Sequence, residues 1–222
     1  MAVIRLISNS KSGIRDMTPK ELKAAIKGSE GRVIMSQLTP LNNMINDATN
    51  PELAQAMGAD MIMVNAYNMQ PDKENFNLNN ANSSKFANGW YIHEYKGKET
   101  GWVNKEVRLK EIKELIDIPI GIYLEVGNAE NIKNQEVTTY GWSEIAPGRK
   151  ANKENFALLK EEGADFVVLA GNPGSGVRYE NIIKATKECR EVVGDDMLIF
   201  AGNANYPPEV GHKIKLHSSE NK

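Results

Sequence analysis

The sequence lacks the features that mark several classes of protein. It has one cysteine among 222 residues, Cys189, so it cannot form an internal disulfide, which favours a reducing compartment such as the cytoplasm. No apolar run approaches the ~20 residues of a membrane-spanning helix, and the opening residues turn polar too soon for a signal peptide. We therefore expect a cytoplasmic protein with no membrane partner.

An excess of charge of one sign is also lacking. The 27 basic and 29 acidic residues are interspersed and give a formal net charge of −2. A nucleic-acid interface needs a clustered basic surface, so we expect no nucleic-acid partner. With 41% hydrophobic and 25% charged residues, the composition is that of an ordinary globular protein.

What the sequence does contain is a regular alternation of helical patterns and short apolar runs. One helix is expected to begin after Thr18, where Pro19 and Glu21 suit a capping box, and to end at Gly28. Near-continuous apolar runs are typical of strands covered on both faces. Helical patterns follow at 50–57, 105–116, 153–162 and 179–193, and the predicted strands are 32–38, 61–65, 120–126, 166–170 and 198–201.

Strands that alternate with helices predict a parallel α/β sheet. We expect a TIM-type (β/α) barrel with five of its eight βα units, forming a single domain over residues 1–222. The alternative is an open five-stranded doubly wound sheet. A long loop at 66–104 and a polar tail at 212–222 lie outside this pattern. A partial barrel leaves unpaired edges, so we expect self-association, or coverage of an edge by the loop or the tail.

Two similar turns precede predicted strands. Gly58-Ala59-Asp60 and Gly163-Ala164-Asp165 each follow a helical pattern and lead into an apolar run. Glycine supplies the left-handed helix end that a short turn needs. We therefore interpret Asp60 and Asp165 as turn residues at the amino-terminal end of the sheet, not as catalysts.

Polar residues follow the predicted strands at their carboxyl ends, where ligands bind in both architectures. Most are neutral amides, which can orient a polar small-molecule ligand by hydrogen bonds. The alternative is that asparagine only tolerates the turn geometry there. The substrate-binding candidates of this kind are Gln37, Asn65, Asn128, Asn172 and Asn203.

Two further features lie at strand ends. Glu125 is a carboxylate inside an apolar run, so burial can raise its pKa and fit it for acid–base catalysis or for binding a divalent metal. The alternative is a structural ion pair with a Lys or Arg. Gly174, Ser175 and Gly176 lie in a glycine-rich segment before a helix, where backbone N–H groups can hold a phosphate or carboxylate. The alternative is a tight turn without a ligand.

Several segments resemble an uncharacterised bacterial family of TIM-barrel proteins, often labelled phosphonomutase-like or haloacid-dehalogenase-like. The motifs that carry this resemblance are 18–22, 29–32, 50–54, 58–60, 119–122, 124–125, 148–151, 163–166 and 171–177, with Gly171-Asn172-Pro173-Gly174 the most specific. The resemblance implies an enzyme and a barrel of eight units, so this chain looks truncated at its C-terminus.

Two functions remain open on this evidence. The first is a barrel enzyme, a lyase, isomerase or hydrolase, that acts on a small anionic, sugar-like or phosphorylated metabolite, with Glu125 as its catalyst. The second is a non-catalytic or degenerate ligand-binding barrel fragment. No cofactor is indicated by the sequence, and a metal at Glu125 stays an open alternative.

Overall fold

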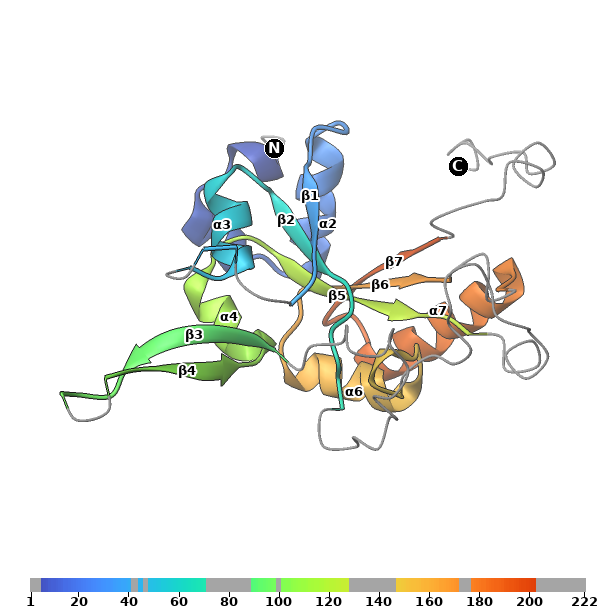
Figure 1. Ribbon diagram of the computed structural model, residues 1–222. Helices are drawn as coiled ribbons and strands as arrows, with labels where there is room; N and C mark the ends of the chain where they lie inside the picture. Colours follow the sequence, from blue (N-terminus) through green and yellow to red (C-terminus); the bar gives the residue numbers. More distant parts are fainter. Residues whose placement is uncertain are drawn as a thin grey trace, which may run out of the picture.

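The computed structural model describes residues 5–40, 44–45, 48–70, 89–98, 101–127, 147–171 and 177–202. Each strand of its central sheet pairs in parallel with the next one in the sheet order β1-β2-β5-β6-β7 (Figure 1). All five strands predicted from apolar runs are confirmed, with ends that differ by up to three residues. The strands are β1 (Met35–Leu38), β2 (Met61–Val64), β5 (Ile120–Glu125), β6 (Phe166–Ala170) and β7 (Leu198–Ala201).

The order of these strands in space follows their order in the chain. A doubly wound sheet reverses its strand order at a switch point, and the five strands that the structure describes contain no such reversal. The fold is therefore an α/β fold, in which helices pack against a parallel sheet whose strands follow chain order from one edge to the other. The doubly wound alternative is not supported.

Most helices begin where the sequence predicted. Thr18 caps α2 (Pro19–Gly28), and its backbone N–H donates to the Glu21 carboxylate at 2.9 Å, which completes the expected capping box. Asn152 caps α6 (Lys153–Glu161) through the backbone N–H of Asn155 at 2.9 Å. The other helices of the described residues are η1 (Leu6–Ser8), α1 (Lys11–Arg15), α3 (Asn50–Ala56), α4 (Leu109–Leu115), η4 (Pro147–Arg149) and α7 (Tyr179–Val193).

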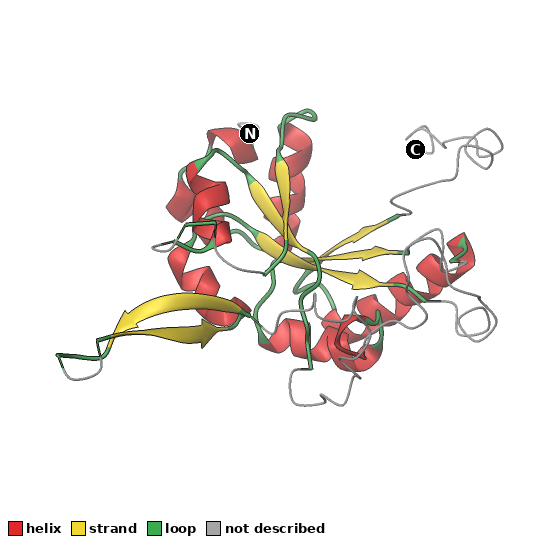
Figure 2. Cartoon of the chain, viewed as in Figure 1, coloured by secondary structure: helices red, strands yellow, loops and turns green. Residues whose placement is uncertain are grey.

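The two faces of the sheet differ in how completely they are covered. On the helical face, α3, α4, α6 and α7 pack against the strands (Figures 1 and 2). Its strand residues are fully buried: Ile62, Val64, Ile122, Leu124, Val167 and Leu169. On the second face, which carries Gly121, Tyr123 and Glu125, α2 covers the amino-terminal ends of the strands. Farther along, Met63, Val168 and Phe200 are only half-buried.

The two Gly-Ala-Asp turns have the same structure. Asp60 accepts a hydrogen bond from the Ile34 N–H at 2.8 Å, and Asp165 accepts one from the Ile120 N–H at 2.9 Å. Each aspartate thus joins the start of its own strand to the start of a neighbouring strand. Gly58 has a positive φ of 96°, a conformation that glycine adopts without strain. The prediction that both aspartates are turn residues is confirmed.

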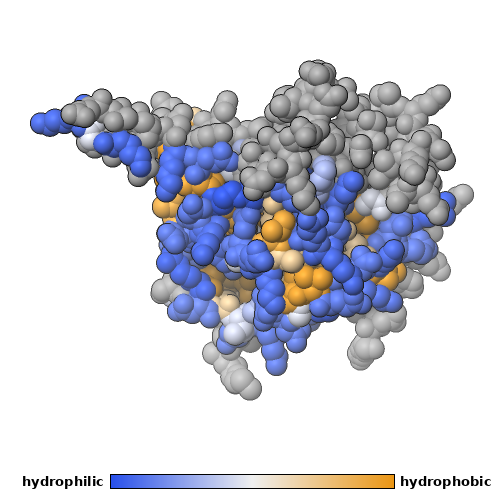
Figure 3. Space-filling model, turned by 90° about the horizontal axis from the view of Figure 1, so that it is seen from below, coloured by the Kyte–Doolittle hydropathy of each residue, from blue (hydrophilic) through white to orange (hydrophobic). Residues whose placement is uncertain are grey.

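A β-hairpin corrects two predictions. The segment 66–104, predicted to be a loop, contains β3 (Trp90–Tyr95), which pairs antiparallel with β4 (Trp102–Val107) and projects as an arm (Figures 1 and 3). The helix expected from residue 105 begins only at Leu109, because 105–107 pair with 90–92. Trp90 is buried at the base of the arm and packs on the Tyr67 ring, with centroids 5.6 Å apart.

Candidate functional site

The candidate site lies at the carboxyl end of the sheet, on its second face. Strand alternation puts Tyr123 and Glu125 of β5 on this face, while Ile122 and Leu124 face the helices. Asn65 directly follows the neighbouring strand β2. Arg149 is the last residue of η4, whose following residue Lys150 forms an isolated parallel bridge with Glu125. These side chains come from three segments that are distant in the sequence.

Arg149 joins the other members of this cluster. Its Nη2 donates a hydrogen bond to Asn65 Oδ1 at 2.9 Å and lies 3.6 Å from Glu125 Oε2. The second distance defines an ion pair but exceeds hydrogen-bond length. Arg149 and Glu125 are 3% and 5% exposed, so both charges lie almost out of contact with water.

Burial and charge both act on the ionisable groups here. Burial raises the pKa of Glu125, and the nearby Arg149 guanidinium opposes this shift. Burial lowers the pKa of Arg149, against the attraction of Glu125, and a guanidinium remains protonated in any case. Burial, together with the Glu125 charge, raises the pKa of Tyr123 to about 12. Tyr123 is therefore a neutral hydroxyl at physiological pH.

The backbone around Arg149 is held in place by a buried asparagine. Asn155 of α6 is fully buried, and its Nδ2 donates to Pro147 O at 2.8 Å and to Lys150 O at 2.7 Å. These two carbonyls lie on either side of Arg149 in the sequence. Gln70 Nε2 in turn donates to Asn155 Oδ1 at 2.6 Å. The arrangement fixes η4, and with it the origin of the Arg149 side chain.

Gly148 brings η4 against the segment that follows β2. Its carbonyl accepts the Met69 N–H at 3.0 Å. A Cβ at this position would lie 1.8 Å from Asn68 Oδ1 and 2.9 Å from the Gln70 nitrogen. Only glycine permits this approach, which is how Arg149 comes within hydrogen-bond distance of Asn65.

The structure brings together only part of the predicted site. Glu125 and Asn65 both contact the guanidinium of Arg149, so only this one group lies between them. Gln37 is exposed. It pairs with Met63, so it lies nearer the amino-terminal end of the sheet than Asn65 does. The other binding candidates lie outside the described residues: Asn128, Asn172, Gly174, Ser175, Gly176 and Asn203.

Sequence reasoning missed two members of the cluster. Tyr123 stands two positions before Glu125 in the same strand, so the period of two was a signal that could have found it. Arg149 follows a proline and a glycine in a single 3₁₀ turn, which has no periodicity to indicate burial. For Glu125, the structure contains the ion pair that the sequence left open as an alternative.

Comparison with known proteins identifies the family but no activity. Residues 7–214 match the family described as "Domain of unknown function (DUF7916)". The chain belongs to DUF7916. No curated protein matches this DUF7916 sequence. The phosphonomutase-like and haloacid-dehalogenase-like labels suggested by the sequence motifs find no support in these comparisons.

One solved structure resembles the DUF7916 chain distantly. It is a provisionally assigned α-N-acetylgalactosaminidase from Bacillus halodurans C-125, with 13% identity and a TM-score of 0.39. The match covers 82% of this chain and 51% of that chain, so the DUF7916 chain corresponds to about half of that protein.

Two features are absent from the described residues. No helix in that part of the chain is long and apolar enough to cross a membrane. The same residues contain no group of three or more His, Cys, Asp or Glu side chains arranged to hold a metal ion.

Proposed function

We propose that this protein is a (β/α)-barrel enzyme that binds a small anionic metabolite, such as a sugar acid or a phosphorylated sugar, at the carboxyl end of its sheet. In this proposal the five strands are the first five units of the barrel. The uninterrupted strand order and the position of α2 at the amino-terminal ends of the strands support that reading.

The observation that carries the proposal is the burial of Arg149 and Glu125 side by side at the end of β5. Burying two charges is costly, even when they form an ion pair. Both side chains are almost completely buried, with Arg149 Nη2 3.6 Å from Glu125 Oε2, and burial raises the pKa of Glu125. Buried charged groups with shifted pKa values at the carboxyl end of a strand are typical of ligand-binding and catalytic sites.

Each side chain of the cluster has a role in this proposal. Arg149 binds the anionic group of the substrate, because its guanidinium offers planar, charge-assisted hydrogen bonds. Asn65 orients Arg149 through its Oδ1. Glu125 is the general acid–base group, since burial raises its pKa toward the neutral range in which such catalysts work. The neutral Tyr123 hydroxyl is a further hydrogen-bond donor.

A divalent metal at Glu125 fits this environment poorly. The guanidinium of Arg149 lies 3.6 Å from the carboxylate and would repel a cation there. The proposal therefore assigns the positive charge of the site to Arg149 and requires no metal ligand set.

A non-catalytic binding protein is the second candidate. The observation in its favour is the same ion pair, because a Glu125 carboxylate engaged with Arg149 is less available as a base. Both functions use Arg149 to bind the ligand, and only the first uses Glu125 for chemistry.

One experiment separates these functions. A thermal-shift screen of sugar phosphates, sugar acids and phosphonates identifies a ligand, whose conversion is then followed by NMR. We expect Glu125→Gln to bind the ligand within a few-fold of the wild type and to lose about 100-fold or more in turnover. Glu191→Gln, in an exposed pair with Lys153, is the matched control and should be unchanged. Binding without turnover in the wild type would support the non-catalytic function.

A further inference from the structure

The first strand of the sheet has a free edge in the described part of the chain. The carbonyls of Ile34 and Leu38 accept hydrogen bonds from the β2 side, from the backbone N–H groups of Asp60 at 2.9 Å and Asn65 at 2.7 Å. Backbone groups of alternate residues in a parallel strand point to opposite sides. Met35 therefore directs its N–H and C=O away from β2, and Gln37, two residues later, does the same. An edge of this kind can pair with another strand.

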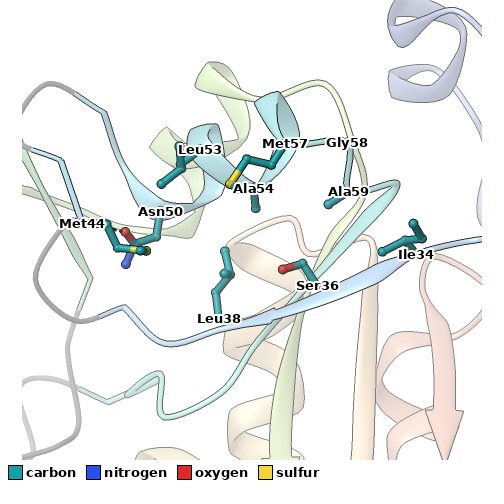
Figure 4. A pocket seen from close by; sticks show the side chains of 10 residues that line it. All are labelled: Ile34, Ser36, Leu38, Met44, Asn50, Leu53, Ala54, Met57, Gly58 and Ala59. Atoms are coloured by element: carbon teal, nitrogen blue, oxygen red, sulfur yellow. Dashed lines mark hydrogen bonds between the residues drawn. The ribbon is translucent and has the colours of Figure 1, made fainter.

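An apolar cleft lies beside this edge. It has a volume of about 300 Å³ and runs between β1 and α3 (Figure 4). Ile34, Ser36 and Leu38 line it from the strand, and Leu53 and Met57 line it from the helix. None of the described residues that line it is charged.

Exposed apolar side chains gather around the same cleft. Three of the eight large hydrophobic residues that are exposed in the described chain line it, Ile34 (62% exposed), Met44 (79%) and Met57 (81%), and exposed Ile45 directly follows Met44 in the sequence. Single exposed hydrophobic residues are normal, but a contiguous group beside an unpaired strand marks an interaction surface.

The opposite edge of the sheet has a different character. A cavity of about 550 Å³ beside β7 is lined by Lys20, Lys23 and Lys27 of α2. Two copies that met at this edge would bring these lysines together, whereas the described residues that line the cleft beside β1 carry no charge. A neutral, apolar surface is complementary to itself, which is what a two-fold interface requires.

We propose that the β1 edge is a two-fold interface with a second copy of this chain. The two β1 strands pair antiparallel around Ser36, which faces the partner's Ser36. Met35 then exchanges both backbone hydrogen bonds with the partner's Gln37. Ile34 packs against the partner's Leu38, on the face that carries the cleft, and Met57 is covered. This inference concerns assembly and does not use the candidate ligand site; it requires that the β1 edge stays unpaired, as in a partial barrel.

The register of this pairing can be tested by cross-linking. Ser36 and the partner's Ser36 form a non-hydrogen-bonded pair, whose Cα atoms lie about 4.5 Å apart, within disulfide range. We expect Ser36→Cys to form a disulfide-linked dimer under mild oxidation, seen on a non-reducing gel. The native Cys189 is buried and gives no background. Gln37→Cys is the matched control, because Gln37 faces the partner's Met35 and should not cross-link.

Sedimentation velocity tests the interface independently of the engineered cysteines. We expect a wild-type dimer at micromolar concentration, and a dissociation constant raised by about tenfold or more in Ile34→Lys. Ile183→Lys, at an exposed site on α7, should leave the dimer unchanged. A monomeric wild type would overturn the proposal. A dimer that neither cross-links at position 36 nor responds to Ile34→Lys would overturn it as well, because its interface must lie elsewhere.

Discussion

Arg149 and Glu125 face each other across 3.6 Å at the carboxyl end of β5, and both side chains are almost completely buried. Removing one member of a buried ion pair leaves an uncompensated charge, which typically costs about 3–5 kcal/mol. The two possible deletions differ, however, because a carboxylate can take up a proton and a guanidinium cannot. This difference gives the pair a measurable pH dependence.

The first prediction concerns stability. In Arg149→Met, Glu125 loses the charge that opposed its raised pKa, so its pKa rises further. A carboxyl whose folded pKa lies above its unfolded value gives its full contribution below the unfolded pKa, and this contribution is lost as pH rises through the folded pKa. We expect Arg149→Met to lose about 2–4 kcal/mol at pH 8 and clearly less at pH 5, as measured by urea unfolding. An equal loss at both pH values would show that Glu125 does not hold a proton in the variant.

The second prediction concerns the binding of anions. Above its pKa, Glu125 neutralises part of the Arg149 charge, and below its pKa it does not. We therefore expect the affinity for an anionic ligand to rise as pH falls through the Glu125 pKa. Glu125→Gln should bind with little pH dependence in the same range. The measurement is calorimetric titration over the pH range in which the protein stays folded, with a ligand that keeps one charge state throughout, and a wild-type profile that is flat speaks against the model.

The third prediction concerns the support of Arg149. Asn155→Ala removes the hydrogen bonds to the carbonyls of Pro147 and Lys150, on either side of Arg149, and the acceptor of the Gln70 side chain. We expect a loss of about 2–3 kcal/mol in stability. Because η4 carries Arg149, we also expect weaker anion binding under conditions in which the variant is fully folded. Unchanged affinity in the folded variant would limit Asn155 to a structural role. Asn152→Ala, which removes only the cap of α6, is the control for helix stability.

The fourth prediction concerns the packing of the second face. A Cβ on Gly121 would lie 2.3 Å from both the ring and the carbonyl oxygen of Phe166. We expect Gly121→Ala to destabilise the protein by about 1–3 kcal/mol through overpacking. Gly202→Ala is the matched control, since no atom of the described residues lies within 4 Å of its added Cβ. Thermal unfolding of both variants tests this, and equal midpoints would contradict the packing described here.

The fifth prediction concerns the single cysteine. Cys189 is fully buried on α7, and burial raises the pKa of its thiol to about 11. We expect its reaction with a disulfide reagent at pH 8 to be at least about 100-fold slower in the folded protein than in urea, because the thiolate is the reactive form. A rate close to that of the unfolded chain would mean that α7 opens readily.

The sheet and most helices could be predicted because their signals are local. Apolar runs, capping residues such as Thr18 and Asn152, and the paired Gly-Ala-Asp turns all act within a few residues of where they stand. The β3–β4 hairpin was missed because the whole segment 66–104 was interpreted as one loop from its length. Gly97 and Gly101, both at positive φ, are a local signal of the turn between the two strands that could have found it.

The candidate site could be predicted only in part. The position of Glu125 near a strand end is visible in the sequence, and so is that of Asn65. The approach of Arg149 depends on the tertiary contact of Gly148 with the segment at Asn68 and on the buried Asn155. No local pattern encodes such contacts, so an arginine in a short 3₁₀ turn gave no sign that it would be buried beside Glu125.

The most direct test of the central claim is the dissociation constant of the best anionic ligand for the wild type and for Arg149→Met. It is measured by calorimetry at fixed ionic strength and at a pH where both proteins are folded. Arg32→Met, at the amino-terminal end of the sheet, serves as the matched control. We predict affinity that is weaker by about tenfold or more in Arg149→Met, as expected for the loss of a charge-assisted contact, and unchanged in Arg32→Met. Equal affinity in all three proteins would contradict the assignment of this cluster as the ligand site.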